Sequence, residues 1–205
     1  MDYVDVFRPS RVVNPPRTKY QVLEVFLERL VDRSEEEACS TPHAERLGFC
    51  GLLRGDASSV CPPPCDSPVC SCGILAVPLA LVAYYLLAKG RRADAEALTP
   101  VVERAAREDG KPCLAQCFKD ALAGREPTCG SWPASFEELY CLALAALVNP
   151  IKRSEALVAV EHAIKKVVEP IPVEIMKGYG IIDKEPTDIG LYFLYKILTT
   201  NQRGS

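Results

Sequence analysis

The sequence has only two histidines and none of the common catalytic motifs. His43 lies in a polar stretch beside Pro42, and His162 lies beside Glu161 in a segment with helical spacing. Neither histidine has a serine or cysteine nearby in a recognisable nucleophile motif. The phosphate-binding GxxxxGK[ST] loop, the GxGxxG turn and the HExxH metal helix are all missing. We therefore expect a non-enzymatic protein with no catalytic residues and no cofactor.

The sequence also lacks an uninterrupted apolar run long enough to cross a bilayer. Its longest run, residues 73–88, reads GILAVPLALVAYYLLA and is interrupted by Pro78. A membrane span needs about 20 apolar residues, so this run fits a buried core helix better. Residues 1–10 contain two aspartates and an arginine where a signal peptide would have an apolar core. We expect no membrane contact and a cytoplasmic location.

Methionine and asparagine are scarce, and neither sign of charge dominates. The chain has two methionines but 17 prolines, and arginine and glutamate are frequent, which is typical of thermophile proteins. The net charge of −3 excludes a surface that is basic all round, although a local basic face remains compatible with it. The hydrophobic fraction of 48% excludes a chain that is disordered throughout.

Cysteine is the main excess. Without a signal peptide, ten cysteines in 205 residues fit the cytoplasm of a hyperthermophilic archaeon, where disulfides are common. The cysteines between residues 61 and 72 lack the paired CxxC spacing of zinc sites. We therefore favour disulfides that hold this loop over a zinc site, and we expect no metal. The candidate disulfide residues are Cys39, Cys50, Cys61, Cys65, Cys70, Cys72, Cys113, Cys117, Cys129 and Cys141.

Two of these cysteines occupy neighbouring turns of one predicted helix. Cys113 and Cys117 are four residues apart on the same helix face. Their Cβ directions suit a mutual bridge poorly, so we do not expect them to bond to each other. Each either pairs with a loop cysteine or is a small core residue.

Apolar residues recur with helical spacing, and no stretch alternates with period two. Thr18 is a predicted N-cap for a first helix, and Ser135 with Glu138 forms a predicted capping box. Residues 74–89 are apolar nearly all round, which places that helix at the centre. These patterns predict an all-α, compact bundle of about five to seven helices with a cysteine-pinned loop.

Proline and glycine divide the chain into three parts. Residues 1–16 contain three prolines and are predicted to form an extended arm. Residues 17–170 form the helical domain, with the cysteine-rich loop region at 39–72. Residues 171–205 form a C-terminal appendage with one short helix, predicted at 189–198.

Two segments of the helical domain look alike. Residues 83–106 and 140–168 each consist of an apolar helix, a short break and a helix rich in alanine and glutamate. This similarity is typical of a helical hairpin of the tetratricopeptide (TPR) type.

Basic residues cluster at the two breaks and near the end of the second hairpin. If the hairpins pack alike, the first two clusters lie at one end of the bundle and form a strip that could contact phosphates. The alternative is a set of solvated helix ends, some stabilised by helix dipoles, and on these residues alone we favour it. The candidate RNA-binding residues are Lys89, Arg91, Arg92, Lys152, Arg153, Lys165 and Lys166.

The order of the apolar helices carries a family resemblance. Residues 73–75 (GIL) lead to an aromatic and lysine ending at 84–89 (YYLLAK), 138–142 (ELYCL) follow, and 155–166 (EALVAVEHAIKK) close the pattern. In this order the chain resembles, over roughly residues 20–169, the small helical subunit of type III-B CRISPR (Cmr) effector complexes.

That resemblance implies a non-enzymatic subunit whose copies stack beside an RNA-guided backbone and support the guide–target duplex through basic side chains. By matching position it implies RNA contacts for Lys89, Lys165 and Lys166 only. The other four basic residues are candidates from charge clustering alone. The expected partners are protein subunits of a larger assembly, including further copies of this chain, and RNA.

Two other functions remain open on the sequence alone. In a structural protein of an archaeal virus, the basic, proline-rich segment 8–19 would reach a neighbour or the genome. In a TPR-like adaptor, a concave apolar surface between Tyr84 and Tyr140 would bind a peptide. A pocket that brought His162 together with a cysteine would favour an enzyme instead.

Overall fold

Helices make up all of the regular structure in the part of the chain that the structure describes. The computed structural model describes residues 3–11, 15–63, 72–130, 135–168 and 186–200. These residues form ten α-helices and three short 3-10 helices, and no strand. Seven of the α-helices have ten residues or more. The predicted all-α fold is confirmed.

The helix starts follow local sequence at both predicted caps. The Thr18 hydroxyl accepts from the backbone N–H of Gln21, and the Ser135 hydroxyl accepts from that of Glu138. In chain order the elements are η1 (Tyr3–Phe7), η2 (Pro9–Arg11), α1 (Lys19–Asp32), α2 (Glu35–Cys39), α3 (Phe49–Leu52), α4 (Ala76–Ala88), α5 (Arg92–Ala97), α6 (Thr99–Glu108), α7 (Pro112–Leu122), α8 (Phe136–Val148), η3 (Pro150–Lys152), α9 (Arg153–Val168) and α11 (Pro186–Thr200).

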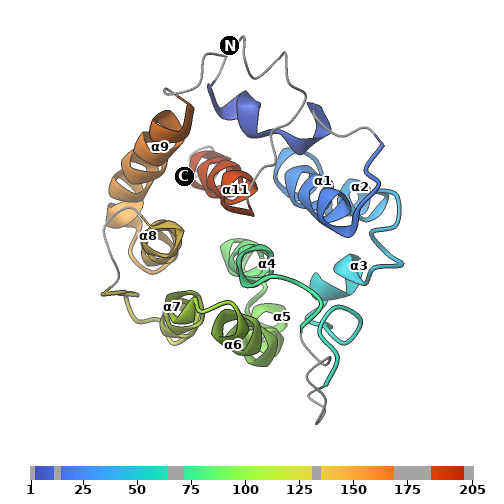
Figure 1. Cartoon of the computed structure of the whole chain (residues 1–205). Coiled ribbons are helices and arrows are strands. Elements are labelled where there is room, and N and C mark those ends of the chain that lie inside the picture. Colours follow the sequence, from blue (N-terminus) through green and yellow to red (C-terminus); the bar gives the residue numbers. More distant parts are fainter. Residues whose placement is uncertain (1–2, 12–14, 64–71, 131–134, 169–185, 201–205) are drawn as a thin grey trace.

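Two apolar helices, α4 and α11, lie in the middle of the fold, and the other long helices surround them (Figure 1). Every residue of α4 from Ala76 to Leu86 is buried, as expected for a helix that is apolar on all sides. Helix α11 contacts α1, α4, α8 and α9. The predicted C-terminal helix is therefore part of the core, and its Phe193 and Leu194 are fully buried.

Both predicted helix pairs pack as hairpins. Helix α4 packs against α6, and α8 packs against α9. The break in the first pair is longer than a simple turn because the separate short helix α5 precedes α6. Pro100 lies in the first turn of α6. A backbone N–H there would have no acceptor within the helix, so proline, which lacks this group, is tolerated. Leu98 is the N-cap residue of α6, and Thr99 is its first helical residue.

Disulfides tie together the middle of the chain. Cys39 pairs with Cys50, and Cys61 pairs with Cys72 across the cysteine-rich loop. Cys65 and Cys70, the other cysteines of that loop, lie outside the described residues. The remaining described pairs are Cys113–Cys129 and Cys117–Cys141, with Cα–Cα distances of 5.8 and 5.4 Å.

Two predictions are confirmed for the described cysteines: a disulfide holds the cysteine-rich loop, and Cys113 and Cys117 do not bond to each other. Cys61–Cys72 closes the loop as a disulfide. Cys113 and Cys117 bond to different partners rather than to each other, as their shared helix face required.

The N-terminal segment differs from its predicted conformation. The described part of the predicted extended arm, residues 3–11, forms the turns η1 and η2, because burial of Val4 and Phe7 favours a compact path. The acidic segment after α1 forms the short helix α2, whose N-cap Ser34 accepts from the N–H of Glu37.

Candidate functional site

Two of the three basic clusters lie at one end of the bundle. Lys89, after the end of α4, shares a small surface depression with Thr200 at the end of α11. Arg153, at the start of α9, donates two hydrogen bonds to the carbonyl of Leu198, at 2.9 and 2.8 Å. The C-terminal end of α11 therefore separates the first cluster from the second.

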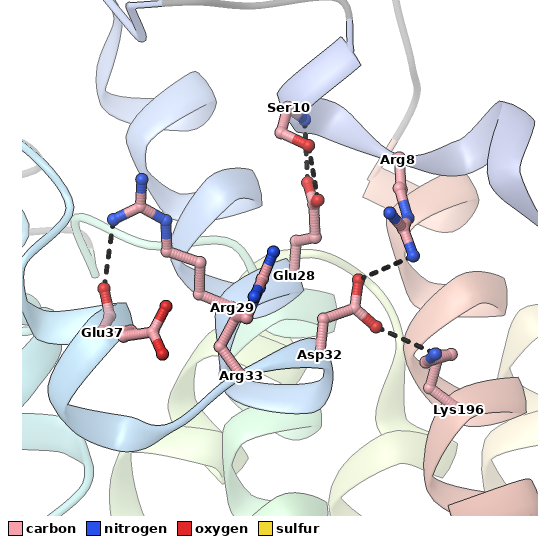
Figure 2. Close-up of a pocket in the computed structure, with 8 residues that line it drawn as sticks. All are labelled: Arg8, Ser10, Glu28, Arg29, Asp32, Arg33, Glu37 and Lys196. Atoms are coloured by element: carbon pink, nitrogen blue, oxygen red, sulfur yellow. Dashed lines mark hydrogen bonds and ion pairs between the residues drawn. The ribbon is translucent and has the colours of Figure 1, made fainter.

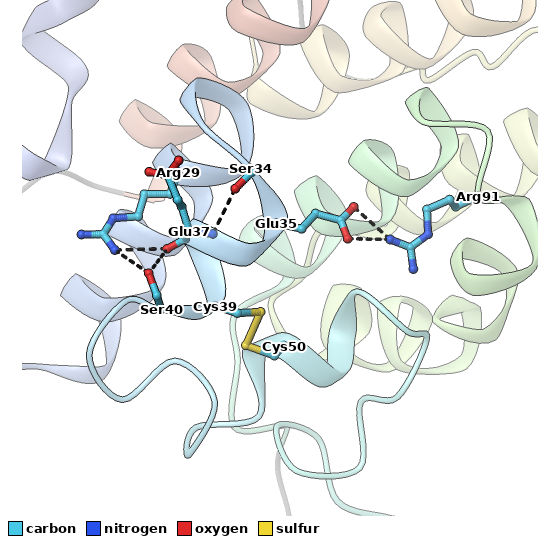
Figure 3. The surroundings of a disulfide bond; sticks show 8 residues. All are labelled: Arg29, Ser34, Glu35, Glu37, Cys39, Ser40, Cys50 and Arg91. Atoms are coloured by element: carbon cyan, nitrogen blue, oxygen red, sulfur yellow. Dashed lines mark hydrogen bonds and ion pairs between the residues drawn. A yellow bond between two sulfur atoms is a disulfide. The ribbon is translucent and has the colours of Figure 1, made fainter.

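Arg91 is used inside the protein. Its guanidinium donates to both carboxylate oxygens of Glu35 at 2.9 Å (Figure 3). The same guanidinium pairs with Asp94 at 2.8 Å. It also donates to the carbonyl of Leu53, and Tyr85 adds a hydroxyl bond to Glu35 at 3.2 Å. Arg91 thus joins α2, α3 and α5, which leaves little of its hydrogen-bonding capacity for an external phosphate.

The second cluster is also largely engaged. Lys152 pairs with Glu126 at 2.9 Å and lies 3.8 Å from Glu155. These carboxylates raise the pKa of Lys152 above its usual value, first through its hydrogen bond with Glu126. Arg153 caps the carbonyl end of α11, where a cation also interacts favourably with the helix dipole.

Of the seven candidate RNA-binding residues, Lys89, Arg92, Lys165 and Lys166 are exposed. Lys165 lies twelve residues beyond Arg153 on α9. At a rise of about 1.5 Å per residue, it is about 18 Å from that end of the bundle. The fold therefore places five of the seven predicted RNA-binding residues at one end, where Arg91, Lys152 and Arg153 are engaged in internal contacts. The exposed lysine pair lies toward the other end.

The outer face of α9 carries an exposed apolar residue that the sequence reasoning did not select. Val158 is 64% exposed, and His162, Lys165 and Lys166 follow it at the same face. Ile151 in the preceding turn η3 is 89% exposed. The helical spacing of α9 could have identified Val158 as exposed, because this residue lies off the buried stripe that contains Ala156 and Val160. We call the exposed residues Ile151, Val158, His162, Lys165 and Lys166 the α9 face.

A polar cavity of about 540 Å³ lies where η1 and η2, α1, α2 and α11 meet (Figure 2). Asp32 of α1 stands at its centre, with only 10% of its side chain exposed. Lys196 lies 3.0 Å from one carboxylate oxygen and Arg8 lies 3.5 Å from the other, with Arg8 above and Lys196 below in Figure 2. The residues that line the cavity are Arg8, Ser10, Glu28, Arg29, Asp32, Arg33, Glu37 and Lys196.

Tyr192 of α11 completes the contacts of Asp32. Its hydroxyl donates to the second carboxylate oxygen of Asp32 at 2.5 Å and accepts from Nε of Arg8 at 3.1 Å. Burial is the main cause that raises the pKa of Tyr192, and the hydrogen bond to Asp32 raises it further. Lys196 also lies 5.9 Å from the centre of the Tyr192 ring. Local sequence patterns do not indicate this network, because its members come from opposite ends of the chain.

Residues with chemistry suited to catalysis or metal binding are dispersed. His43 and His162 are both exposed, and the described cysteines are in disulfides. Within the described ranges, three or more histidine, cysteine, aspartate or glutamate side chains do not gather in a way that could hold a metal ion. Among the described helices, none combines the length and hydrophobicity that a bilayer crossing requires.

Comparison with known proteins adds no relative. No family model matches the chain, and no curated protein and no solved structure matches it.

Proposed function

We propose that this chain is a helical assembly subunit that acts by binding other macromolecules, and that the α9 face is its contact surface. The observation that carries the proposal is the exposure of Val158 on the same helix face as a lysine pair, together with the exposure of Ile151 in the preceding turn. These aliphatic side chains gain free energy when a partner removes them from water. A partner with a neighbouring anionic group would also be attracted by Lys165 and Lys166.

For the identity of the assembly, the proposal is an RNA-guided CRISPR effector complex. Its support is the resemblance in helix order and the exposure of Lys89, Lys165 and Lys166, the basic positions to which that resemblance extends. Arg92 is the other exposed member of the predicted set. Arg91, Lys152 and Arg153 are better explained by the internal contacts that they make, so the proposed RNA contacts no longer include them.

The proposed location is the cytoplasm of a hyperthermophilic archaeon. Disulfides persist inside such cells, whereas the cytosol of most mesophiles keeps thiols reduced. The described disulfides also suit an extracellular protein. Alkylation of free thiols in freshly lysed host cells, followed by mass spectrometry, distinguishes these settings when cytoplasmic and secreted fractions are analysed separately.

The test is a pull-down of the tagged protein from its native host, with mass spectrometry of the proteins and sequencing of the RNA. We expect CRISPR subunits and guide RNA with the unaltered chain. Val158→Asp should reduce recovery of the proteins. Lys165→Glu combined with Lys166→Glu should reduce recovery of the RNA.

Each variant has a matched control in the chain. Tyr20 is an apolar residue 52% exposed on another helix, so Tyr20→Asp should leave recovery unchanged. Arg107 is an exposed cation on α6, so Arg107→Glu serves the same purpose for the lysine pair. Recovery of neither CRISPR subunits nor guide RNA would contradict the CRISPR proposal. Equal loss in Val158→Asp and Tyr20→Asp would contradict the α9 face.

The fold offers less support for the other two functions, the TPR-like peptide adaptor and the structural protein of an archaeal virus. Tyr84 and Tyr140 are both fully buried, with ring centres 6.2 Å apart, so they line no peptide groove. In the basic segment 8–19, Arg8 is held by Asp32 and Tyr192 instead of extending outward. A filament formed by the purified protein alone would still support the viral function over the CRISPR one.

A further inference from the structure

Helix α1 places like charges next to each other on the side that faces the polar cavity. Glu28 and Asp32 are four residues apart, and so are Arg29 and Arg33. Such i,i+4 pairs of like charge are neighbours on a helix and destabilise it. The helix therefore needs partners of opposite charge, or hydrogen-bonding groups, for both pairs.

The acidic pair has its partners within the chain. The backbone N–H and hydroxyl of Ser10 donate to Glu28 at 2.8 and 2.5 Å. Asp32 has Arg8, Lys196 and the Tyr192 hydroxyl around it. The N-terminal turns and α11 thus compensate the acidic pair fully.

The basic pair has no such compensation. Among the described residues, the Arg29 guanidinium donates only to neutral acceptors, the Glu37 carbonyl at 3.1 Å and the Ser40 hydroxyl at 3.5 Å. The Arg33 side chain is exposed and makes no hydrogen bond or ion pair to any residue in the described ranges, although its backbone N–H donates to the Arg29 carbonyl. The carboxylate of Glu37 lines the same cavity but forms no ion pair with either arginine there.

We propose that the cavity binds the phosphate group of a small phosphorylated molecule, with Arg33 as the principal ligand and Arg29 as its neighbour. Two guanidinium groups one helical turn apart present planar forks that match phosphate oxygens. Figure 2 shows the Arg33 side chain between those of Arg29 and Glu28, on the side of Asp32 away from Lys196. The lining holds four cationic and three acidic side chains, a net charge of +1 that attracts an anionic group.

The size of the cavity favours a ligand larger than phosphate alone. A volume of about 540 Å³ lies within the range of small-molecule sites, about 300–1,000 Å³. A nucleoside monophosphate carries the required group together with a body that fills this space. The carboxylate of Glu37 is available to accept from its hydroxyl groups. The proposal is independent of the assembly role, because the α9 face does not line this cavity.

The test is calorimetric titration of the full-length, oxidised protein with inorganic phosphate and, separately, with adenosine monophosphate, against sodium chloride of equal ionic strength. We expect saturable binding of both ligands, and tighter binding of the nucleotide if it is the natural source. Arg33→Gln should weaken binding by roughly tenfold, the usual effect of losing a charge-assisted hydrogen bond. The double variant Arg29→Gln with Arg33→Gln should weaken it further.

Arg107→Gln is the matched control, because Arg107 is also an exposed arginine in the last turn of its helix. It should bind both ligands like the unaltered protein. Arg33 has no partner to lose, so Arg33→Gln should keep the unliganded melting temperature, and circular dichroism checks this. Absence of saturable binding by the unaltered protein would overturn the proposal. Equal affinities of the unaltered protein and the double arginine variant would overturn it as well.

Discussion

The middle of the chain and its two ends are held together by different forces. All ten cysteines lie between residues 39 and 141, and four described disulfides join α2 to α3, close the cysteine-rich loop, and fasten α7 to its neighbours. The ends have no cysteine. Helix α1 and helix α11 meet through buried apolar side chains and the network around Asp32.

The two regions show two ways to stabilise the packing of helices: covalent links between segments, and charged and hydrogen-bonded contacts between folded helices. A disulfide acts mainly by restricting the unfolded chain, and its effect does not depend on salt or pH. The Asp32 network acts only in the folded state and through charge, so ions and pH can weaken it. The short helices α2 and α3, with five and four residues, occur where covalent links are present.

Reduction of the disulfides should have the largest effect. Each contributes about 2–4 kcal/mol, and a typical domain is stable by only about 5–15 kcal/mol. We expect the melting temperature to fall by about 20 °C or more, or the cooperative transition to disappear. Circular dichroism with and without a phosphine reductant measures this. An unchanged melting temperature would show that the middle of the chain does not depend on its covalent links.

Substitutions at two glycines test whether the disulfide-bonded middle of the chain is also less able to relax around an added methyl group. A Cβ on Gly51 would lie 2.8 Å from the backbone oxygen of Asp56, next to Cys50 in its disulfide. A Cβ on Gly190 would lie 2.5 Å from the edge of the Phe136 ring, which can move. We expect Gly51→Ala to cost about 1–3 kcal/mol and Gly190→Ala less, despite the shorter distance.

Urea unfolding of both variants gives these free energies. Gly130→Ala is the control, because its Cβ would have no atom within 4 Å. If Gly190→Ala were the more damaging change, the contact between α8 and α11 would be the more rigid part of the molecule, and the contrast between the two regions would be wrong.

Tyr192→Phe should have the smallest effect on the free energy of unfolding, and that effect should depend on pH. Loss of the hydroxyl bonds to Asp32 and Arg8 should cost about 1–2 kcal/mol at neutral pH. Burial and Asp32 raise the pKa of Tyr192 above its ordinary value of 10.0. The stabilisation linked to this shift is therefore complete below about pH 10 and is lost as the pH rises further. The difference between the variant and the unaltered protein should narrow in that alkaline range.

Unfolding in urea at several pH values measures the difference in unfolding free energy between Tyr192→Phe and the unaltered protein. Tyr140→Phe is the control in the disulfide-bonded middle of the chain, where the Tyr140 hydroxyl donates to the Ala80 carbonyl at 2.9 Å. Limited proteolysis adds a second readout. Cleavage within α11 should become faster in Tyr192→Phe and stay unchanged in Tyr140→Phe. Faster cleavage in both would indicate a general loss of stability instead of a weakened junction.

Local patterns predicted the helices well, but long-range partners could not be read from the sequence. Thr18 and Ser135 marked helix starts because a cap depends on residues within one turn. Cysteine pairing and the contact between Arg91 and Glu35 depend on which segments meet in space, which spacing does not determine. The same reason explains why residues 171–205 were expected to be an appendage although α11 fills the core.

The position of α11 in the chain has a consequence for biosynthesis. A chain emerging from the ribosome presents α1 to α9 before α11 exists, so the helices around the centre form first with their apolar inner faces uncovered. The cysteines have all emerged by then and can already pair. Folding should therefore proceed through a covalently tied intermediate with an unfilled centre, which needs protection from aggregation until α11 is synthesised and enters it.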